Sequence, residues 1–292
     1  MKLLIHNYAD HKSSEPIYLY QALQYANIDV AIWSDPNASA FDVFDRAKPD
    51  VFITHYRFIT NDILTYLNQS SKNIRLVVNV TDASETQLDS IKSVLPENYL
   101  LFTNSFNGPS GVETIYPAAD IFQQPSNDFN LPNLKKLSVG LISDKNSDTL
   151  QEIAGKNSVY HILYMGEDKD YADFDLRADV RSLKRIMKLY EQIHLVGDSN
   201  LCTSQLFFDL CLFSDNLRVT STEQEKFNKT MSKIFDDVSD VEDVQKEMKS
   251  QVKLKHTPFH RAARLMKMLG EKRAMQSLET IKSQLGELMK DL

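Results

Sequence analysis

Short apolar runs alternate with helix-type patterns along the first 105 residues. The apolar runs fall at residues 3–6, 29–33, 51–55, 74–80 and 99–103. The helix-type segments between them fall at residues 13–26, 41–47, 61–67 and 84–95. Pro16 in a first turn and Ser84 at a cap position are helix-start signals. Strands and helices that alternate at this spacing predict a doubly wound parallel sheet.

The same alternation starts again after a proline-bounded stretch, Thr114 to Pro125. Strand patterns follow at residues 136–142, 159–165, 193–196 and 217–220. Helix patterns lie between and after them at residues 150–154, 180–190, 204–212 and 223–235. We therefore expect an α/β protein with two Rossmann-like domains, residues 1–121 and 133–255, joined by a linker at 122–132.

The last 37 residues, 256–292, have a purely helical pattern. A first helix reaches Leu269, Gly270 interrupts the pattern, and a second helix covers residues 271–292. Its apolar positions are spaced by three and four residues, at Leu278, Ile281, Leu285, Leu288 and Leu292. A stripe of about two heptads is marginal alone and must be buried somewhere. Docking back on the first domain is the favoured interpretation; the alternative is an oligomer formed through residues 271–292.

Composition narrows the class of protein. The chain has 292 residues and a net charge of −7, and residues 256–292 carry 7 Lys/Arg against 4 Asp/Glu, so the rest is at −10. A net acidic body argues against nucleic-acid binding. Two cysteines in apolar surroundings, Cys202 and Cys211, predict buried free thiols and no metal site. No apolar run reaches the roughly 20 residues of a membrane span, and no signal peptide is evident, so a cytoplasmic location is expected.

Ligands of parallel α/β sheets bind at the carboxyl ends of the strands. In the first domain those positions hold His6 after the first strand and His55 after the third, followed by Tyr56 and Arg57. A neutral imidazole can accept a proton from a hydroxyl group near neutral pH, and His55 is the favoured candidate. The alternative is that His55 ends its strand and bonds to the backbone.

Several segments resemble glycosyltransferases of the GT-B type. The stretch from Ile115 to Pro125 resembles the interdomain crossing of that family, with Phe122 one place early, and Pro49-Asp50-Val51 resembles the strand that leads to an acceptor-side histidine. Segment 204–209 is similar to the "RxFE" helix of the CgeB-like, glycosyltransferase family 4-like branch. Segment 256–262 is similar to the "HTxxxRA" segment of the same branch.

This resemblance implies a transferase that uses a nucleotide-diphosphate sugar and an unknown acceptor. Such a transferase needs no metal and no covalently bound cofactor, because basic side chains and a helix dipole offset the leaving-group charge. The second domain would bind the donor, Lys145 would face the diphosphate, Asp209 would hold the ribose and His55 would act as base. The residues mapped to donor binding are Gly140, Lys145, Gly166, Glu167, Ser204 and Asp209.

The donor motifs depart from the family pattern. Leu206 stands where the resemblance expects Arg, Asp209 replaces Glu, and none of the 8 glycines precedes Gly108. Such a site lacks a bidentate clamp and the close backbone approach that glycine permits. A second hypothesis is therefore a catalytically inactive GT-B-fold protein that serves as a structural or binding component of a larger assembly, for example a viral one. A third hypothesis is a phage-type DNA glycosyltransferase, against which the acidic body counts.

Overall fold

The chain divides into two compact units. The computed structural model describes residues 1–7, 15–105, 108–119, 121–122, 137–143, 147–156, 160–164, 174–175, 190–198, 200, 202, 204–214, 216–235 and 244–288. Unit 1 consists of Met1–Ala9, Glu15–Tyr116 and Pro258–Leu285. Unit 2 consists of Asp10–Ser14, Pro117–Thr257 and Gly286–Leu292. The chain therefore leaves unit 1 after Tyr116 and returns to it at Pro258.

Unit 1 contains a six-stranded parallel sheet, sheet A, with the order β2-β1-β3-β4-β5-β6. Its strands are β1 (Leu3–His6), β2 (Val30–Trp33), β3 (Val51–His55), β4 (Arg75–Asn79), β5 (Tyr99–Thr103) and β6 (Glu113–Thr114). The helices between them are α1 (Glu15–Tyr25), α2 (Ala40–Ala47), the 3-10 turn η1 (Tyr56–Phe58), α3 (Asn61–Gln69) and α4 (Glu85–Val94). Ser84 caps α4 in a capping box with Gln87, as its sequence signature predicts.

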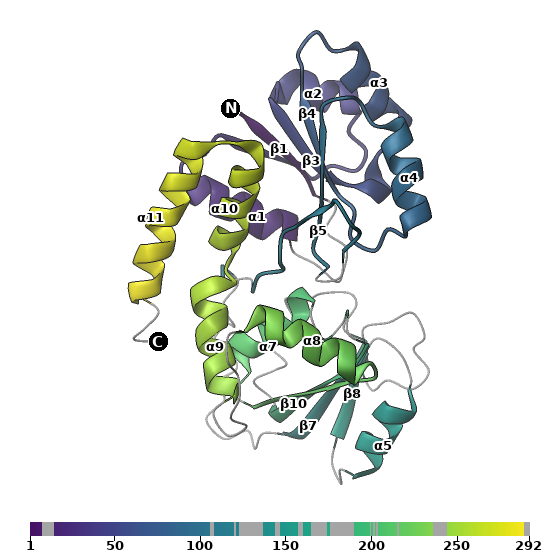
Figure 1. Ribbon diagram of the computed structural model, residues 1–292, viewed down its shortest axis with the longest axis vertical. Helices are drawn as coiled ribbons and strands as arrows, with labels where there is room; N and C mark the ends of the chain where they lie inside the picture. Colours follow the sequence, from purple (N-terminus) through teal and green to yellow (C-terminus); the bar gives the residue numbers. More distant parts are fainter. Residues whose placement is uncertain are drawn as a thin grey trace. The chain divides into compact units, whose positions relative to one another are not determined.

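The two faces of sheet A are covered by different helices. On one face, Leu4 and Phe52 of the strands pack with Phe44 of α2, Ile63 of α3 and Leu88 of α4. Neighbouring strand residues point to the opposite face, where α1 and α10 (Pro258–Leu269) lie against each other. Figure 1 shows α10 and α11 (Lys272–Leu288) beside α1.

Helix α10, from the C-terminal part of the chain, is thus part of unit 1, although about 140 residues separate it from β6. Phe259 of α10 contacts the Tyr25 ring at the end of α1, edge to face, at 5.6 Å. Arg75 Nη1 at the start of β4 donates to the Leu269 carbonyl at the other end of α10, at 3.3 Å. In α11, Leu278 is fully buried. Gly270 separates the two helices with a φ of +76°, a conformation that favours glycine.

Unit 2 contains a five-stranded parallel sheet, sheet B, with the order β11-β10-β7-β8-β9. Its strands are β7 (Leu137–Ser143), β8 (Tyr160–Tyr164), β9 (Phe174–Asp175), β10 (Tyr190–Gly197) and β11 (Leu217–Ser221). Its helices are α5 (Asp148–Lys156), α7 (Gln205–Phe213), α8 (Gln224–Ile234) and α9 (Val244–Lys255). The predicted fold class is confirmed, since each unit holds a parallel Rossmann-like sheet and the chain ends in helices.

Strand β10 and helix α9 differ from the sequence-based expectations for unit 2. The helix predicted over residues 180–190 lies outside the described residues except for Tyr190, and Tyr190 is the first residue of β10 rather than the end of a helix. Strand β10 therefore starts three residues before the predicted strand, because Tyr190 pairs with Leu137 of β7 and adds to the ladder. Helix α9 was not predicted.

Candidate functional site

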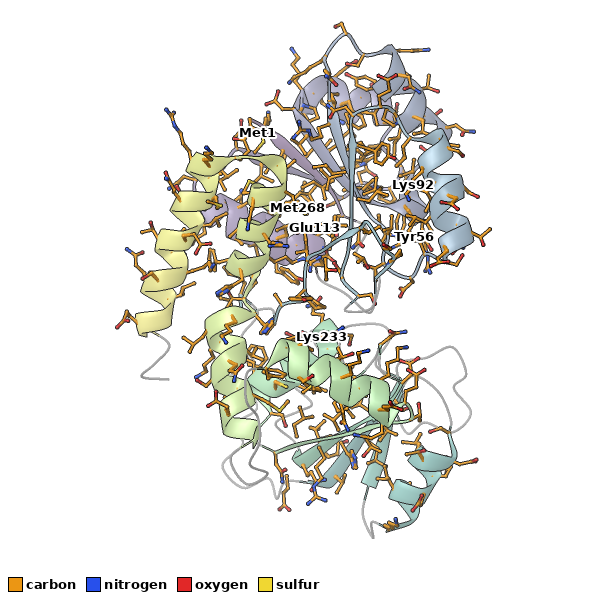
Figure 2. All side chains as sticks on the ribbon, viewed as in Figure 1. Met1, Tyr56, Lys92, Glu113, Lys233 and Met268 are labelled. Atoms are coloured by element: carbon orange, nitrogen blue, oxygen red, sulfur yellow. The ribbon has the colours of Figure 1, made fainter. Side chains whose placement is uncertain are left out.

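The carboxyl edge of sheet A has a topological switch point between β1 and β3. The chain runs from β1 to β2 on one side and continues to β3 on the other side of β1. Open parallel sheets bind ligands at such points. His6 ends β1, and η1 follows directly on His55 at the end of β3 (Tyr56 is labelled in Figure 2). We call the residues His6, Trp33 and His55–Phe58 the edge site.

His6 is held rigidly in the edge site. Its ring stacks on the nearly buried Trp33 ring, with 4.5 Å between centroids and an interplanar angle of 20°. Its Nδ1 lies 3.0 Å from Thr54 Oγ1, and that hydroxyl lies 3.5 Å from the His55 carbonyl oxygen. If the hydroxyl donates to this carbonyl, it accepts from His6 Nδ1–H, which leaves the Nε2 lone pair as an acceptor. Burial lowers the pKa of His6 to about 4, so the ring is neutral at pH 7.

His55, the candidate chosen from sequence, directs its ring to the backbone. Its Nδ1 accepts from the Arg57 backbone N–H at 3.3 Å and thereby caps η1. Burial lowers the pKa of His55, while the charge of Glu15 and a hydrogen bond to the Thr81 backbone raise it. Both hydrogen bonds agree with the alternative stated above, in which His55 ends its strand and bonds to the backbone. The role of His55 as a base stays a prediction.

His6, which the sequence analysis ranked below His55, also lies in the edge site. Both histidines end a strand, and the preceding segment Pro49-Asp50-Val51 was the additional signal that favoured His55. What distinguishes His6 is the partner on its Nδ1, supplied by Thr54 from the neighbouring strand β3. The alternation of side chains along β3 predicts on which face of the sheet Thr54 lies. It does not predict the distance from Thr54 to the His6 ring.

A buried polar network lies next to the edge site. Glu15, the first residue of α1, accepts a hydrogen bond from Asn104 Nδ2 at 2.5 Å and from Asn79 Nδ2 at 3.4 Å, and pairs with Arg261 of α10. Arg261 Nη1 also donates to the Ile115 and Tyr116 carbonyls at 3.0 and 2.9 Å. The side chains of Glu15 and Arg261 are 3% and 2% exposed. The charge of Glu15 is therefore neutralised inside unit 1.

Arg261 belongs to the segment whose sequence resembles a C-terminal family motif. No role for this arginine could be predicted from the sequence, because its partners lie about 150 to 250 residues away along the chain. The structure assigns it a contact with three parts of unit 1 at once. It joins α10 to the start of α1, to the loop after β5 and to the end of β6.

In unit 2 the switch point lies between β7 and β10, because sheet B has the strand order of dinucleotide-binding domains. The next described helix after β7 is α5, where Ser147 Oγ accepts from the Leu150 N–H at 3.1 Å and caps the helix. Gly140, predicted to bind the donor, is in the middle of β7. It pairs with Ile193 of β10 on one side and with His161 of β8 on the other, three residues before the strand ends.

Ser204 directly precedes α7, and Asp209 is in the middle of that helix. Ser204 occupies the N-cap position without a capping side-chain bond. Asp209 is 1% exposed, and its Oδ2 accepts from Gln205 Nε2 at 3.4 Å. Asp209 is therefore more buried than an acidic residue on the solvent-facing side of a helix would be. Lys145, Gly166 and Glu167 lie outside the described residues, so their predicted roles stay predictions.

Three further expectations concern metals, thiols and membranes. Cys202 and Cys211 are free and buried, as predicted. Within the described part of the chain, no group of three His, Cys, Asp or Glu side chains is close enough to hold a metal ion. No helix in those same residues has the length and apolar character to cross a bilayer.

The stacking of Trp33 on His6 gives a direct test of the neutral imidazole. Trp33 is the one tryptophan of the chain. Because protonated imidazole quenches a stacked indole, Trp33 emission is expected to stay constant from pH 8 down to about pH 5 if the pKa of His6 is about 4. The His6→Gln variant gives the baseline without titration. A quenching midpoint near pH 6.5 that disappears in His6→Gln would contradict the depressed pKa.

Comparison with known proteins yields similarity in structure alone. No family model and no curated protein sequence matches this chain. Among solved structures, MurG of Acinetobacter baumannii is similar over 98% of this chain and 100% of its own, with 8% identity and a TM-score of 0.42. A provisionally assigned aspartate carbamoyltransferase of Leishmania major is similar over 82% of this chain and 66% of its own, with 12% identity and a TM-score of 0.18. At these scores the fold conclusion rests on the strand orders of sheets A and B.

Proposed function

We propose that this protein is a glycosyltransferase that transfers a sugar from a nucleotide-diphosphate sugar to a hydroxyl group of an acceptor. The observation that carries the proposal is the order of sheet B, β11-β10-β7-β8-β9, all parallel. This is the order that places a nucleotide diphosphate over the carboxyl ends of the central strands. A second parallel sheet with its own switch point is present in unit 1.

The donor would bind at the carboxyl end of β7. Lys145 lies between β7 and α5 in the sequence, and α5 has N-terminal N–H groups in its first turn. A helix N-terminus binds phosphate through free N–H groups and the positive end of its dipole. We propose that Lys145 offsets the charge of the leaving diphosphate and that Asp209 holds the ribose. The latter role requires the carboxylate to exchange its contact with Gln205 for the ligand.

The acceptor would bind at the edge site of unit 1, with His6 in place of His55 as the base. The acceptor hydroxyl donates its proton to His6 Nε2 while its oxygen forms a bond to the anomeric carbon of the donor sugar. The bond from that carbon to the diphosphate oxygen breaks, and the diphosphate leaves with the electron pair. His6 can take this role because it is neutral at pH 7 and because its Nε2 lone pair is the acceptor when Nδ1–H donates to Thr54 Oγ1.

A catalytically inactive scaffold is the second candidate, and the state of Asp209 favours it. A carboxylate that is 1% exposed and accepts a hydrogen bond from Gln205 is already satisfied inside α7. Leu206, where the resemblance expects Arg, is also buried. Under this hypothesis, unit 2 keeps the nucleotide-binding topology without nucleotide affinity.

A thermal-shift panel with UDP, GDP, ADP, CMP and their sugar conjugates separates the two candidates. A nucleotide at about 100 times its Kd is expected to add roughly 2.7 kcal/mol of stability. Lys145→Ala should reduce that shift, whereas Lys156→Ala, which removes an exposed ion pair with Glu152 at the far end of α5, should leave it unchanged. No shift with any nucleotide at millimolar concentration would rule out the transferase.

The role of His6 needs a separate variant. His6→Gln should retain the nucleotide shift, because His6 belongs to unit 1 and the donor site to unit 2. It should lower the rate of sugar transfer or donor hydrolysis by about 10²- to 10⁴-fold, the usual contribution of a general base. His55→Gln is the matched comparison. A larger loss of rate in His55→Gln than in His6→Gln would return the base assignment to His55.

A further inference from the structure

Five rings form one continuous cluster at the carboxyl edge of sheet A. Trp33 stacks on His6, and His6 meets the edge of Phe58 at 5.8 Å. Phe58 contacts His55 at 6.2 Å, and His55 contacts Tyr56 at 4.7 Å. We call these residues the ring cluster. Three strands of the sheet and the η1 turn contribute to it, so its shape is set by the sheet.

Phe58 is the part of the ring cluster that faces solvent. Its side chain is 42% exposed, among few large apolar residues exposed in the described part of the chain. The position is imposed by η1, which begins directly after β3 and is capped by the His55 ring. The next residue inward, His6, rests on the nearly buried Trp33. An exposed phenyl ring is thus fixed beside an imidazole at a switch point.

The described charges at the edge of the sheet that carries the ring cluster do not favour an anionic ligand. Arg57 places its guanidinium 5.6 Å from the centre of the Tyr56 ring, and its Nε donates to Tyr56 Oη at 3.1 Å. Asp35 and Asp82, which follow β2 and β4 at the same edge, are exposed. Two exposed carboxylates at the same edge of the sheet disfavour phosphate groups there. A nucleotide or nucleic acid therefore fits this edge poorly.

We propose that the ring cluster binds a neutral sugar ring, so that the acceptor of the proposed transferase is an uncharged carbohydrate. One face of a pyranose carries C–H groups that pack on an exposed aromatic ring, and its rim carries hydroxyl groups. Phe58 supplies the aromatic surface and His6 Nε2 accepts from a hydroxyl. That the bound sugar is an acceptor rests on the proposed function. Binding of the sugar ring itself can be measured without any donor.

Trp33 fluorescence provides the test on the full-length protein. Maltose, cellobiose and N,N′-diacetylchitobiose are titrated as probes, with AMP as a planar anionic comparison. At least one disaccharide is expected to produce a saturable change in Trp33 emission. In Phe58→Ala its affinity should be roughly fivefold to tenfold lower, the usual contribution of an aromatic contact. Val94→Ala, which truncates an exposed apolar residue at the end of α4, should bind like the original protein.

The outcomes separate this inference from the proposed function. Sugar binding that depends on Phe58, together with no nucleotide shift, would support the ring cluster as a carbohydrate site and overturn the transferase. The inference is overturned if no disaccharide changes the Trp33 emission, or if Phe58→Ala binds as tightly as Val94→Ala. Tighter binding of AMP than of every disaccharide would also overturn it. Unchanged circular dichroism of Phe58→Ala confirms that the variant is folded.

Discussion

Replacing Arg261 with methionine is expected to lower the unfolding free energy of unit 1 by about 3–5 kcal/mol. The variant keeps a long apolar side chain but leaves the Glu15 carboxylate buried, with two asparagine amides as its remaining described partners. It also removes the donor for the Ile115 and Tyr116 carbonyls. A buried charge without its counter-ion costs much more than the intact pair contributes, because water cannot replace the lost partner.

The neighbouring Arg264 is a matched control on the same helix. It pairs with Glu113 (labelled in Figure 2), but both side chains are more than 40% exposed. Arg264→Met should therefore cost at most about 1 kcal/mol. Urea unfolding followed by Trp33 fluorescence reports on unit 1 directly, because the single tryptophan is in that unit.

A double variant tests the cause of the loss. Glu15→Gln in the Arg261→Met background removes the stranded charge and should recover part of the stability, which a double-mutant cycle quantifies. Equal costs for Arg261→Met and Arg264→Met would show that water reaches the network and that Arg261 does not hold α10 in place.

Acidification from pH 7.5 to pH 5 is expected to destabilise unit 2 by about 2 kcal/mol through His256 alone. The His256 ring packs against Phe208 and Phe235, with centroid distances of 4.8 and 6.0 Å, and its buried Nε2 has no hydrogen-bond partner among the described residues. Burial lowers its pKa to about 4. Below the ordinary value of 6.5, the unfolded chain takes up a proton that the folded unit does not, so stability falls as pH drops from about 6.5 to about 4.

His194 should add to this loss, because burial lowers its pKa to about 4 as well and Arg218 contributes in the same direction. The measurement is urea unfolding by far-ultraviolet circular dichroism at several pH values, with Trp33 fluorescence recorded on the same samples to separate unit 1. His256→Phe should reduce the pH dependence by about one proton and keep the aromatic packing. His6→Gln should leave the unfolding of unit 2 unaffected. A wild-type unfolding free energy that is constant from pH 7.5 to 5 would contradict the depressed pKa values.

Local patterns in the sequence determined most of the secondary structure and the fold class. Alternating apolar runs and helix starts such as Pro16 and Ser84 are local signals, and strand β4 is recognisable from its apolar run alone. Periodicity also predicted the break at Gly270. The start of β10 at Tyr190 was not predictable, because that residue joins the strand through its pairing with β7, a contact that short-range patterns do not encode.

Only the tertiary structure decided which side chains meet. The sequence favours His55 over His6, but the contacts of the two rings are set by Thr54 on a neighbouring strand and by the backbone of η1. In the same way, Arg261 gains its role from Glu15, Asn104 and the end of β6, and Asp209 its burial from the packing of α7. The physical reason is that hydrogen bonds and desolvation act within a few ångströms, whereas these partners are separated by up to 246 residues along the chain.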